Sequence, residues 1–172
     1  MRRGLFVLRH AKSSWEDASL ADHDRPLAPR GQRDLGRLRR HLGARDAPVE
    51  VVLCSSAARA AQTLEGVRPA LPEHADVRID PRLYHASASQ WLAQLRELPA
   101  DTAAALIVGH NPSLETLVRE LTGSGEPAAV GPLERKYPTG ALAELELADA
   151  WADLAPATCH LAALVVPREL PD

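Results

Sequence analysis

The chain has 172 residues, a formal net charge of −3 at pH 7, 45% hydrophobic residues and 25% charged residues. These values are ordinary for one globular domain and exclude a mainly disordered chain. A slightly acidic chain has no general attraction to nucleic acid or to an anionic membrane, so neither is expected as a partner. Any binding site for an anion must therefore be a local feature.

The thiols and the absence of long apolar runs favour a cytoplasmic protein. The apolar run of residues 5–8 is too short for a signal peptide, and no stretch approaches the length of a membrane span. Cys54 and Cys159 are too few for a disulfide scaffold in a chain of this length, so we expect reduced thiols. The cytoplasm is the predicted location.

The stretch LFVLRHAKSS, residues 5–14, is the most informative part of the sequence. Its apolar start suits a buried strand that runs directly into Arg9 and His10. The end of a strand in an open α/β sheet is where ligands bind. Because successive strand residues point to opposite faces, both side chains can face one ligand only if the chain turns there. Residues 11–14 suit such a turn and offer an ammonium group, hydroxyls and backbone N–H groups to an anion.

Strands and helices are predicted to alternate after this stretch. Residues 15–29 are rich in Asp, His and Pro, and we expect them to form a loop over the strand ends. An amphipathic helix over residues 30–42 and a buried strand over residues 50–54 follow. Ser55 and Ser56 stand where the N-cap of a helix over residues 57–64 belongs.

The second half of the chain continues the alternation. A buried strand over residues 103–108 runs into His110, so the pattern of a strand ending in a histidine occurs twice. The other predicted elements are a short strand at residues 77–79, a helix at 91–98 capped by Ser87 or Ser89, a helix from Pro112 to Leu121 capped by Asn111, a surface loop at 123–138, and strands at 141–147 and 161–166.

Two charged segments have simpler explanations than binding. Asp22-His23-Asp24 offers side chains that can ligate metals, but adjacent ligands without a supporting set elsewhere indicate a solvated turn. No metal site is predicted there. The arginines on the helix at residues 30–42 form a charged face, and such faces are usually solvated rather than bound to nucleic acid.

The alternation predicts a layered α/β sheet whose parallel strands end on a common side. Arg9, His10, Arg59 and His110 then converge from three separate segments. Two arginines and two histidines around one point suit a phosphoryl group. The guanidinium groups can neutralise its non-bridging oxygens, and one imidazole can act as the nucleophile.

Three polar motifs carry a resemblance to a known family. LRHAKSSW, SSAARAAQT and VGHNPSLE resemble, in their order and separations, the histidine phosphatase superfamily with its phosphoglycerate-mutase-like fold. Within that superfamily, RHAKSSW, DHDRPLAPRGQRD, RLYHAS and PTGALAELEL are similar to SixA-type phosphohistidine phosphatases. The resemblance covers nearly the whole chain. It implies one histidine phosphatase domain over residues 1–172, built as a three-layer α/β/α sandwich with a mostly parallel central sheet.

The resemblance also implies catalytic roles. His10 is the nucleophile that accepts the phosphoryl group, Arg9 and Arg59 bind its oxygens, and His110 donates a further hydrogen bond. The hydroxyl of Ser13 is a further expected phosphate ligand. Water then hydrolyses the phosphohistidine intermediate. Neither a metal nor another cofactor is expected, because the arginines and an imidazole supply the positive charge. The expected substrate is phosphohistidine on a partner protein.

One departure from the family bears on the substrate. Many mutases and phosphomonoesterases of the superfamily place a glutamate proton donor in the segment that corresponds to residues 82–85, where this chain has no acid. An alkoxide leaving group needs a proton, whereas an imidazole leaving from phosphorus can already carry one. Phosphohistidine is therefore favoured over a sugar phosphate. Residues 65–76 are also too few for the lid insertions of larger members, so an open site is expected.

Two other functions stay open at this point. A phosphomonoesterase for small metabolites would use the same four residues, with His85 as its proton donor. A non-catalytic phosphate-binding module would use the same pocket for recognition alone, although the intact His10 speaks against it. A mutase is less favoured, because it must retain a phosphorylated intermediate in a closed site.

Overall fold

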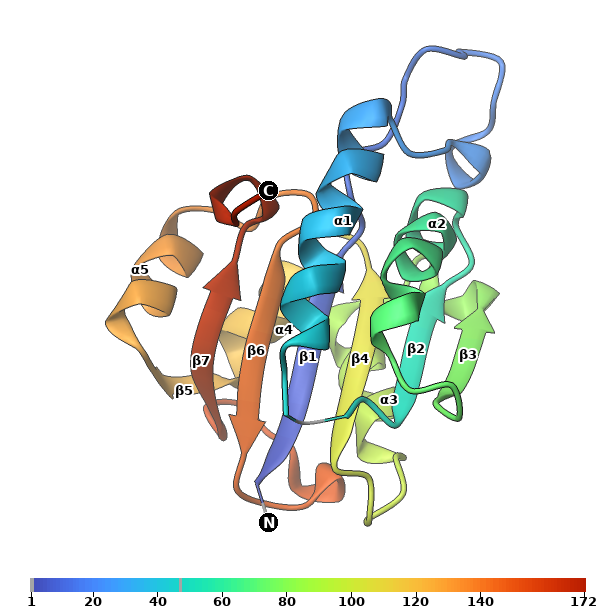
Figure 1. Cartoon of the computed structure of the whole chain (residues 1–172). Coiled ribbons are helices and arrows are strands. Elements are labelled where there is room, and N and C mark those ends of the chain that lie inside the picture. Colours follow the sequence, from blue (N-terminus) through green and yellow to red (C-terminus); the bar gives the residue numbers. More distant parts are fainter. Residues whose placement is uncertain (1, 47) are drawn as a thin grey trace.

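The computed structural model describes residues 2–46 and 48–172. Its strands are β1 (Arg3–Arg9), β2 (Val51–Ser55), β3 (Asp76–Asp80), β4 (Ala104–Gly109), β5 (Thr122–Gly125), β6 (Leu142–Leu147) and β7 (Cys159–Val165). They form one sheet in the order β3-β2-β4-β1-β6-β7-β5 (Figure 1). Among these strands only β6 runs against its neighbours, so the sheet is mostly parallel as predicted.

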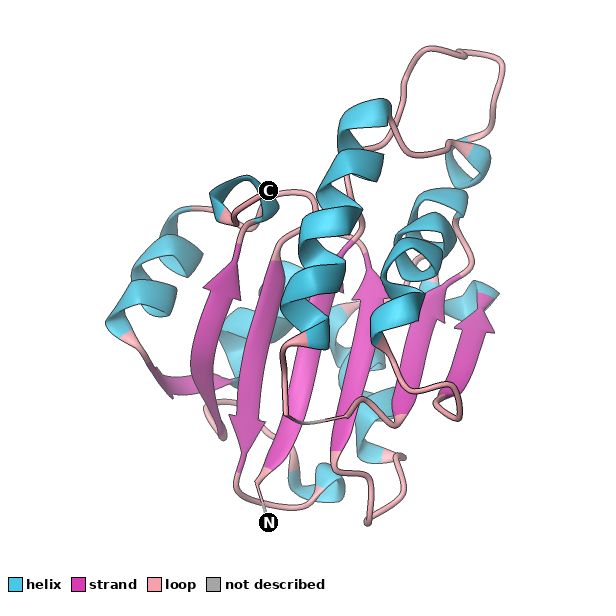
Figure 2. Cartoon of the chain, in the orientation of Figure 1, coloured by secondary structure: helices cyan, strands magenta, loops and turns pink. Residues whose placement is uncertain are grey.

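Helices cover both faces of the sheet and give the three predicted layers (Figure 2). One face carries α1 (Pro29–Gly43) and α2 (Ala58–Val67), and the other carries α3 (Ala88–Arg96), α4 (Ser113–Leu121) and α5 (Pro127–Arg135). Alternate residues of β1 enter the two cores. Phe6 packs with the first pair of helices, and Val7 with the remaining three. A strand covered on both faces must be apolar along its whole length, which explains the run LFVL.

The register of β1 against β4 positions the two histidines. Arg9 pairs with Gly109, and the N–H of His10 donates to the carbonyl of Gly109 at 3.0 Å. Because the strands are parallel, His10 and His110 leave the sheet side by side. A side chain at position 109 would have no room, since a Cβ there would lie 2.8 Å from Cζ2 of Trp91.

The segment at residues 123–138 corrects one prediction. It was expected to be a surface loop, but most of it forms β5 and α5. The glycines that suggested a loop allow a close approach instead. A Cβ on Gly123 would lie 2.1 Å from the carbonyl oxygen of Ala157, and one on Gly125 would lie 2.9 Å from that of Leu161. Only glycine fits at positions 123 and 125 of this edge strand.

Two helix starts also differ from the prediction. Ser55 is the last residue of β2, and α2 begins at Ala58 without a side-chain cap, because the hydroxyl of Ser55 accepts from the N–H of Ala57 inside the turn. Helix α4 begins at Ser113, one residue after Pro112. The oxygen of Asn111 still accepts from the N–H of Glu115 at 3.3 Å. The prediction for α3 is confirmed, since Ser87 caps it in a capping box with Gln90.

The segment between β1 and α1, called the site loop here (residues 12–28), extends past the carboxyl ends of the parallel strands (Figure 1). It has one 3-10 turn at Asp22–Asp24, so the prediction of a loop over the strand ends holds. Cys54 and Cys159 are buried free thiols, also as predicted. Within residues 2–46 and 48–172, no helix has the length and apolar character needed to cross a bilayer.

Tyr137 provides a test of the core. Its buried hydroxyl donates to the carbonyl of Val7 at 2.6 Å and accepts from the N–H of Ala143 at 3.2 Å. We expect Tyr137→Phe to lower the free energy of unfolding in urea by about 1–3 kcal/mol, because two buried main-chain groups lose a partner. Tyr84→Phe is the matched control, since Tyr84 bonds the half-exposed carboxylate of Asp22. Equal stability of the wild type and Tyr137→Phe would contradict this account.

Candidate active site

The ends of β1, β2 and β4 bring the predicted catalytic residues together. His10 and His110 have ring centroids 5.2 Å apart. Arg59 enters from the first turn of α2, and its Cζ lies 5.8 Å from the ring of Tyr84, which in turn lies 5.6 Å from that of His110. The predicted convergence of residues from three segments is therefore present in the structure.

The imidazole of His10 is held in one tautomer. Its Nδ1 lies 2.7 Å from the carbonyl oxygen of Ala11, which can only accept, so Nδ1 carries the proton and Nε2 keeps a lone pair. The N–H of Ala11 donates to the hydroxyl of buried Thr63 at 3.0 Å, which fixes the turn after β1. Burial lowers the pKa of His10 to about 4, and the charges of Arg59 and Arg9 act in the same direction. The imidazole of His10 is therefore neutral near pH 7.

His110 is also neutral near pH 7. Burial lowers its pKa to about 3, and the proximity of His10 and Arg59 adds to this effect. Its Nε2 lies 2.7 Å from the hydroxyl of Ser55. Its Nδ1 is buried and has no hydrogen-bond partner among the described residues. A buried polar atom without a hydrogen-bond partner costs free energy, and a bound ligand could supply that partner.

The two predicted arginines differ in how they are held. Nη1 of Arg9 donates to the carbonyl of Tyr137 at 2.9 Å, and its buried Nε has no partner among the described residues. Burial lowers the pKa of Arg9, although the nearby Glu115 opposes this. Both terminal nitrogens of Arg59 donate to Asp22, one to its carbonyl at 2.7 Å and one to its carboxylate at 3.0 Å. The remaining N–H groups of both guanidiniums are available to an anion.

The site loop supplies two residues that the sequence analysis missed, Asp22 and Arg25. The carboxylate of Asp22 accepts from Arg25 at 2.9 Å, from Arg59 and from the hydroxyl of Tyr84. The hydrogen bond from Tyr84, with those from the arginines, lowers the pKa of Asp22 to about 2. Asp22 is thus part of the site and not only a solvated turn. Its motif lies in the loop expected to cover the strand ends, which is the signal that could have revealed it.

Ser13 and His85, the other two predicted site residues, lie beside this centre. The hydroxyl of Ser13 is buried and accepts from Nη2 of Arg25 at 2.6 Å, so its own proton remains available to an anion. The exposed ring of His85 lies 4.0 Å from that of Tyr84, between centroids, which places His85 at the rim. Their roles toward a phosphoryl group stay predictions.

The charges of the site suit an anion. The guanidinium groups of Arg25 and Arg59 pair with the carboxylate of Asp22, that of Arg9 lies near Glu115, and both imidazoles are neutral. Three positive charges less two negative charges leave a surplus of one among these residues. A phosphoryl group, which carries up to two negative charges near pH 7, is attracted to this surplus.

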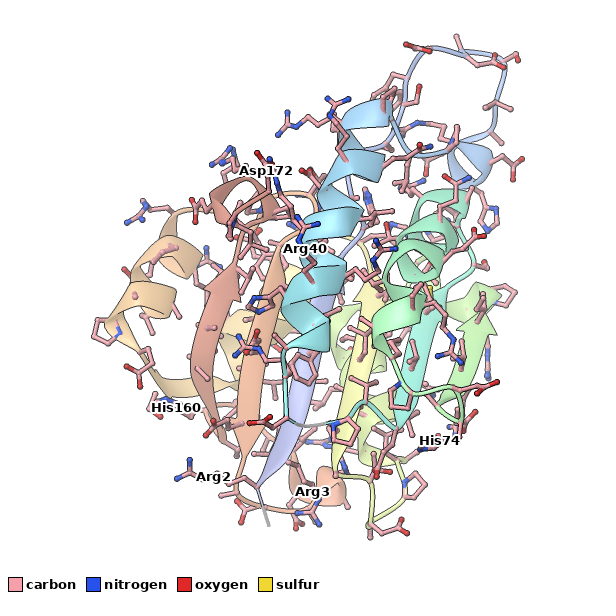
Figure 3. The ribbon with its side chains drawn as sticks, viewed as in Figure 1. Arg2, Arg3, Arg40, His74, His160 and Asp172 are labelled. Carbon is pink, nitrogen blue, oxygen red and sulfur yellow. The ribbon has the colours of Figure 1, made fainter. Side chains whose placement is uncertain are left out.

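A hollow at the opposite end of the sheet contains none of these residues. It has a volume of about 720 Å³ and is lined by Arg2, Glu126 and His160, among others. Figure 3 shows Arg2 and His160 near the end of the sheet that lies away from the site loop. The carboxyl ends of the parallel strands, not this hollow, hold the convergent polar groups.

Comparisons with known proteins agree with this geometry. Residues 5–101 match the histidine phosphatase superfamily (branch 1). An uncharacterized protein of Mycobacterium tuberculosis is 39% identical over 163 residues, covering 94% of this chain and 100% of the relative. A structure from Nakamurella multipartitia, described as a candidate phosphohistidine phosphatase SixA, is 34% identical, covers 97% of both chains and has a TM-score of 0.84. A structure from Agrobacterium tumefaciens with the same description is 24% identical, covers 96% of this chain and 98% of that chain, and has a TM-score of 0.80.

The chain therefore belongs to the histidine phosphatase superfamily and is a phosphatase. Its fold is phosphoglycerate-mutase-like, and within the superfamily it is of the SixA type. The expectations of family, fold and enzyme class drawn from the three motifs are confirmed.

The lowered pKa values predict a loss of stability in acid. In the unfolded chain both histidines take up protons near pH 6.5, whereas folded His10 and His110 do so only near 4 and 3. Lowering the pH through 6.5 therefore favours the unfolded state. We expect the free energy of unfolding to fall by roughly 2 kcal/mol per histidine between pH 7 and pH 5.

Urea unfolding at pH 7, 6 and 5 measures this loss. His10→Asn and His110→Asn should each remove about half of the pH dependence. Asp22 titrates lower, with a pKa of about 2, so this pH range isolates the histidines. A stability that stays constant or rises from pH 7 to pH 5 would show that the imidazoles are not buried in neutral form.

Proposed function

We propose that the protein hydrolyses phosphohistidine on a partner protein through a covalent intermediate on His10. The tautomer of His10 is the observation that carries this proposal. With the Nδ1 proton donated to Ala11, Nε2 is a neutral nucleophile in a site whose surplus positive charge fits a phosphoryl group. The likeness to the Nakamurella structure, described as a candidate phosphohistidine phosphatase, supports the same substrate.

The first step transfers the phosphoryl group to the enzyme. Nε2 of His10 attacks phosphorus, and the phosphorus–nitrogen bond of the substrate breaks. The substrate imidazole, already protonated on its other ring nitrogen, leaves as a neutral ring with the bonding electron pair on the nitrogen released. Arg9 and Arg59 stabilise the phosphoryl oxygens during transfer. His110 adds a donor when the hydroxyl of Ser55 donates to its Nε2 and the proton stands on Nδ1. The hydroxyl of Ser13 is a further donor. The buried unpartnered nitrogens of Arg9 and His110 are the groups that a phosphoryl oxygen would complete.

The second step returns the enzyme to its starting state. Water attacks phosphorus, the bond to Nε2 breaks, and Nε2 regains its lone pair. Phosphate leaves with one proton of the water, and the other proton passes to solvent. The low pKa of His10 in the free enzyme keeps it ready for the next attack. No step requires a cofactor or a metal ion, because fixed guanidinium groups hold the charge.

Two broader predictions remain part of the proposal. All site residues lie on one sheet with its adjoining helices and loops, which supports a single domain over residues 1–172. The cytoplasmic location stays a prediction from the sequence.

The decisive experiment is phosphate release from a carrier protein phosphorylated on histidine, in the presence of a metal chelator. We expect His10→Ala to lower kcat by at least about 10³, because it removes the nucleophile. Rapid quenching under alkaline conditions, where phosphohistidine survives, should trap phosphate on the wild-type enzyme only. Undiminished hydrolysis by His10→Ala would refute the covalent mechanism. Binding of phosphate without turnover by the wild type would support the non-catalytic module instead.

Substitution of His85 tests whether the substrate is phosphohistidine or a small phosphate ester. Its exposed ring beside Tyr84 is the candidate proton donor for an alkoxide leaving group. We expect His85→Ala to change the kcat for a phosphohistidine protein less than about threefold, because an imidazole leaving group needs little help. The phosphomonoesterase would be favoured by two results together. The kcat of His85→Ala for a sugar phosphate would fall by about 10², and the wild type would be more active on that ester than on the phosphohistidine protein.

A further inference from the structure

Trp15 is the most exposed of the large apolar side chains in the described parts of the chain. It is 71% exposed, and the others in this class are Leu20 at 37% and Ile79 at 53%. Trp15 and Leu20 both belong to the site loop, which projects beyond the strand ends (Figures 1 and 2). Tryptophan is enriched among the residues that contribute most to protein–protein binding, and this one lies on the segment that also forms the active site, which makes it a candidate contact for a protein partner.

Trp15 is held in place by Arg25. The Cζ atom of Arg25 lies 3.2 Å from the centroid of the indole ring. The guanidinium is buried and donates to the carbonyl of Ser14 at 3.0 Å, to the carboxylate of Asp22 at 2.9 Å and to the hydroxyl of Ser13 at 2.6 Å. Because all three of its nitrogens have partners, Arg25 forms a fixed base beneath the indole ring. A side chain ordered before binding loses little entropy when a partner arrives.

The same contacts connect Trp15 to the catalytic centre. Asp22 joins Arg25 to Arg59, with N···O distances of 2.9 and 3.0 Å. Ser13 lies three residues after His10, and its hydroxyl is bound by the same guanidinium. Trp15 is therefore connected to Arg59 through Arg25 and Asp22.

The depth of His10 indicates what kind of substrate would reach both places. His10 is only 7% exposed and lies at the floor of the site, while Trp15 faces solvent above Arg25. A phosphohistidine side chain on a folded protein can extend to the floor while the surface around it meets Trp15. Its phosphoryl group is also complementary in charge to Arg9, Arg25 and Arg59. Exposed Glu16 and Asp17 beside Trp15 would be repelled by an anionic membrane.

We propose that Trp15, stacked on Arg25, is a docking contact for the protein that carries the phosphohistidine. The inference rests on the proposed function and adds to it the surface by which a protein substrate is distinguished from a small phosphorylated molecule. The occupant is a folded protein with a phosphohistidine on its surface, and the indole ring binds the area next to that residue.

The test compares two substrates of different size. One is a small carrier protein phosphorylated on a single histidine, and the other is free phosphohistidine. We expect Trp15→Ala to lower kcat/KM at least tenfold on the carrier, mainly through KM, and less than twofold on the free amino acid. Trp15→Phe should recover part of the loss, because a smaller aromatic ring still covers Arg25. Ile79→Ala, at an exposed apolar position on β3, is the matched control and should leave both substrates unaffected.

Inhibition by inorganic phosphate shows whether the floor of the site is intact. We expect the same inhibition constant, within twofold, for the wild type and Trp15→Ala. Equal losses on both substrates, with weaker phosphate inhibition, would mean that Trp15 only positions Arg25. Unchanged kcat/KM on the carrier would also overturn the proposal, as would a wild type that sediments with anionic lipid vesicles in a Trp15-dependent manner. Failure of the proposed function itself is distinct, since the wild type would then release phosphate from neither substrate.

Discussion

The parallel pairing of β1 with β4 is the constraint on which the rest of the site depends. The pairing of Arg9 with Gly109 makes two histidines from distant segments leave the sheet together. The hydrogen bond from the N–H of His10 to the carbonyl of Gly109 extends this register one residue beyond the strands. A shift of one residue would turn alternate side chains to the other face and separate the imidazoles. The apolar residues that bury β1 on both faces therefore also determine the geometry of catalysis.

Burial lowers the pKa of both kinds of basic side chain but leaves them in different charge states. It keeps His10 and His110 neutral, because an imidazolium ion would lose its hydration. The guanidinium of Arg9 also loses hydration, but its unperturbed pKa is so high that it remains charged. One environment thus yields uncharged nitrogens able to attack or donate and fixed cations able to bind oxygens. Asp22 partly balances these cations from the site loop.

The sequence predicted the fold and the core of the site better than it predicted the parts that depend on distant contacts. The apolar runs before His10 and His110 predicted two strands from local patterns alone. The convergence of four residues then followed from the parallel pairing of those strands. The role of Asp22 depends on Arg59 and Tyr84, which lie 37 and 62 residues away in the sequence. The strand β5 depends on the backbone of Ala157, because Gly123 favours a loop unless another chain segment lies against it. No local pattern contains these contacts.

Tyr137 links folding and catalysis in a way that bears on how such a site can change. Its hydroxyl joins β1 to β6, while its carbonyl accepts from Arg9 and from the side chain of Asn111 at 3.0 Å. The residue that secures the core thus also positions the guanidinium of Arg9, a proposed phosphate ligand. Mutations that repack the core near Tyr137 would be selected against through lost activity as well as through lost stability. Substrate range can drift most freely through the site loop, whose outer residues contribute little to the two hydrophobic cores.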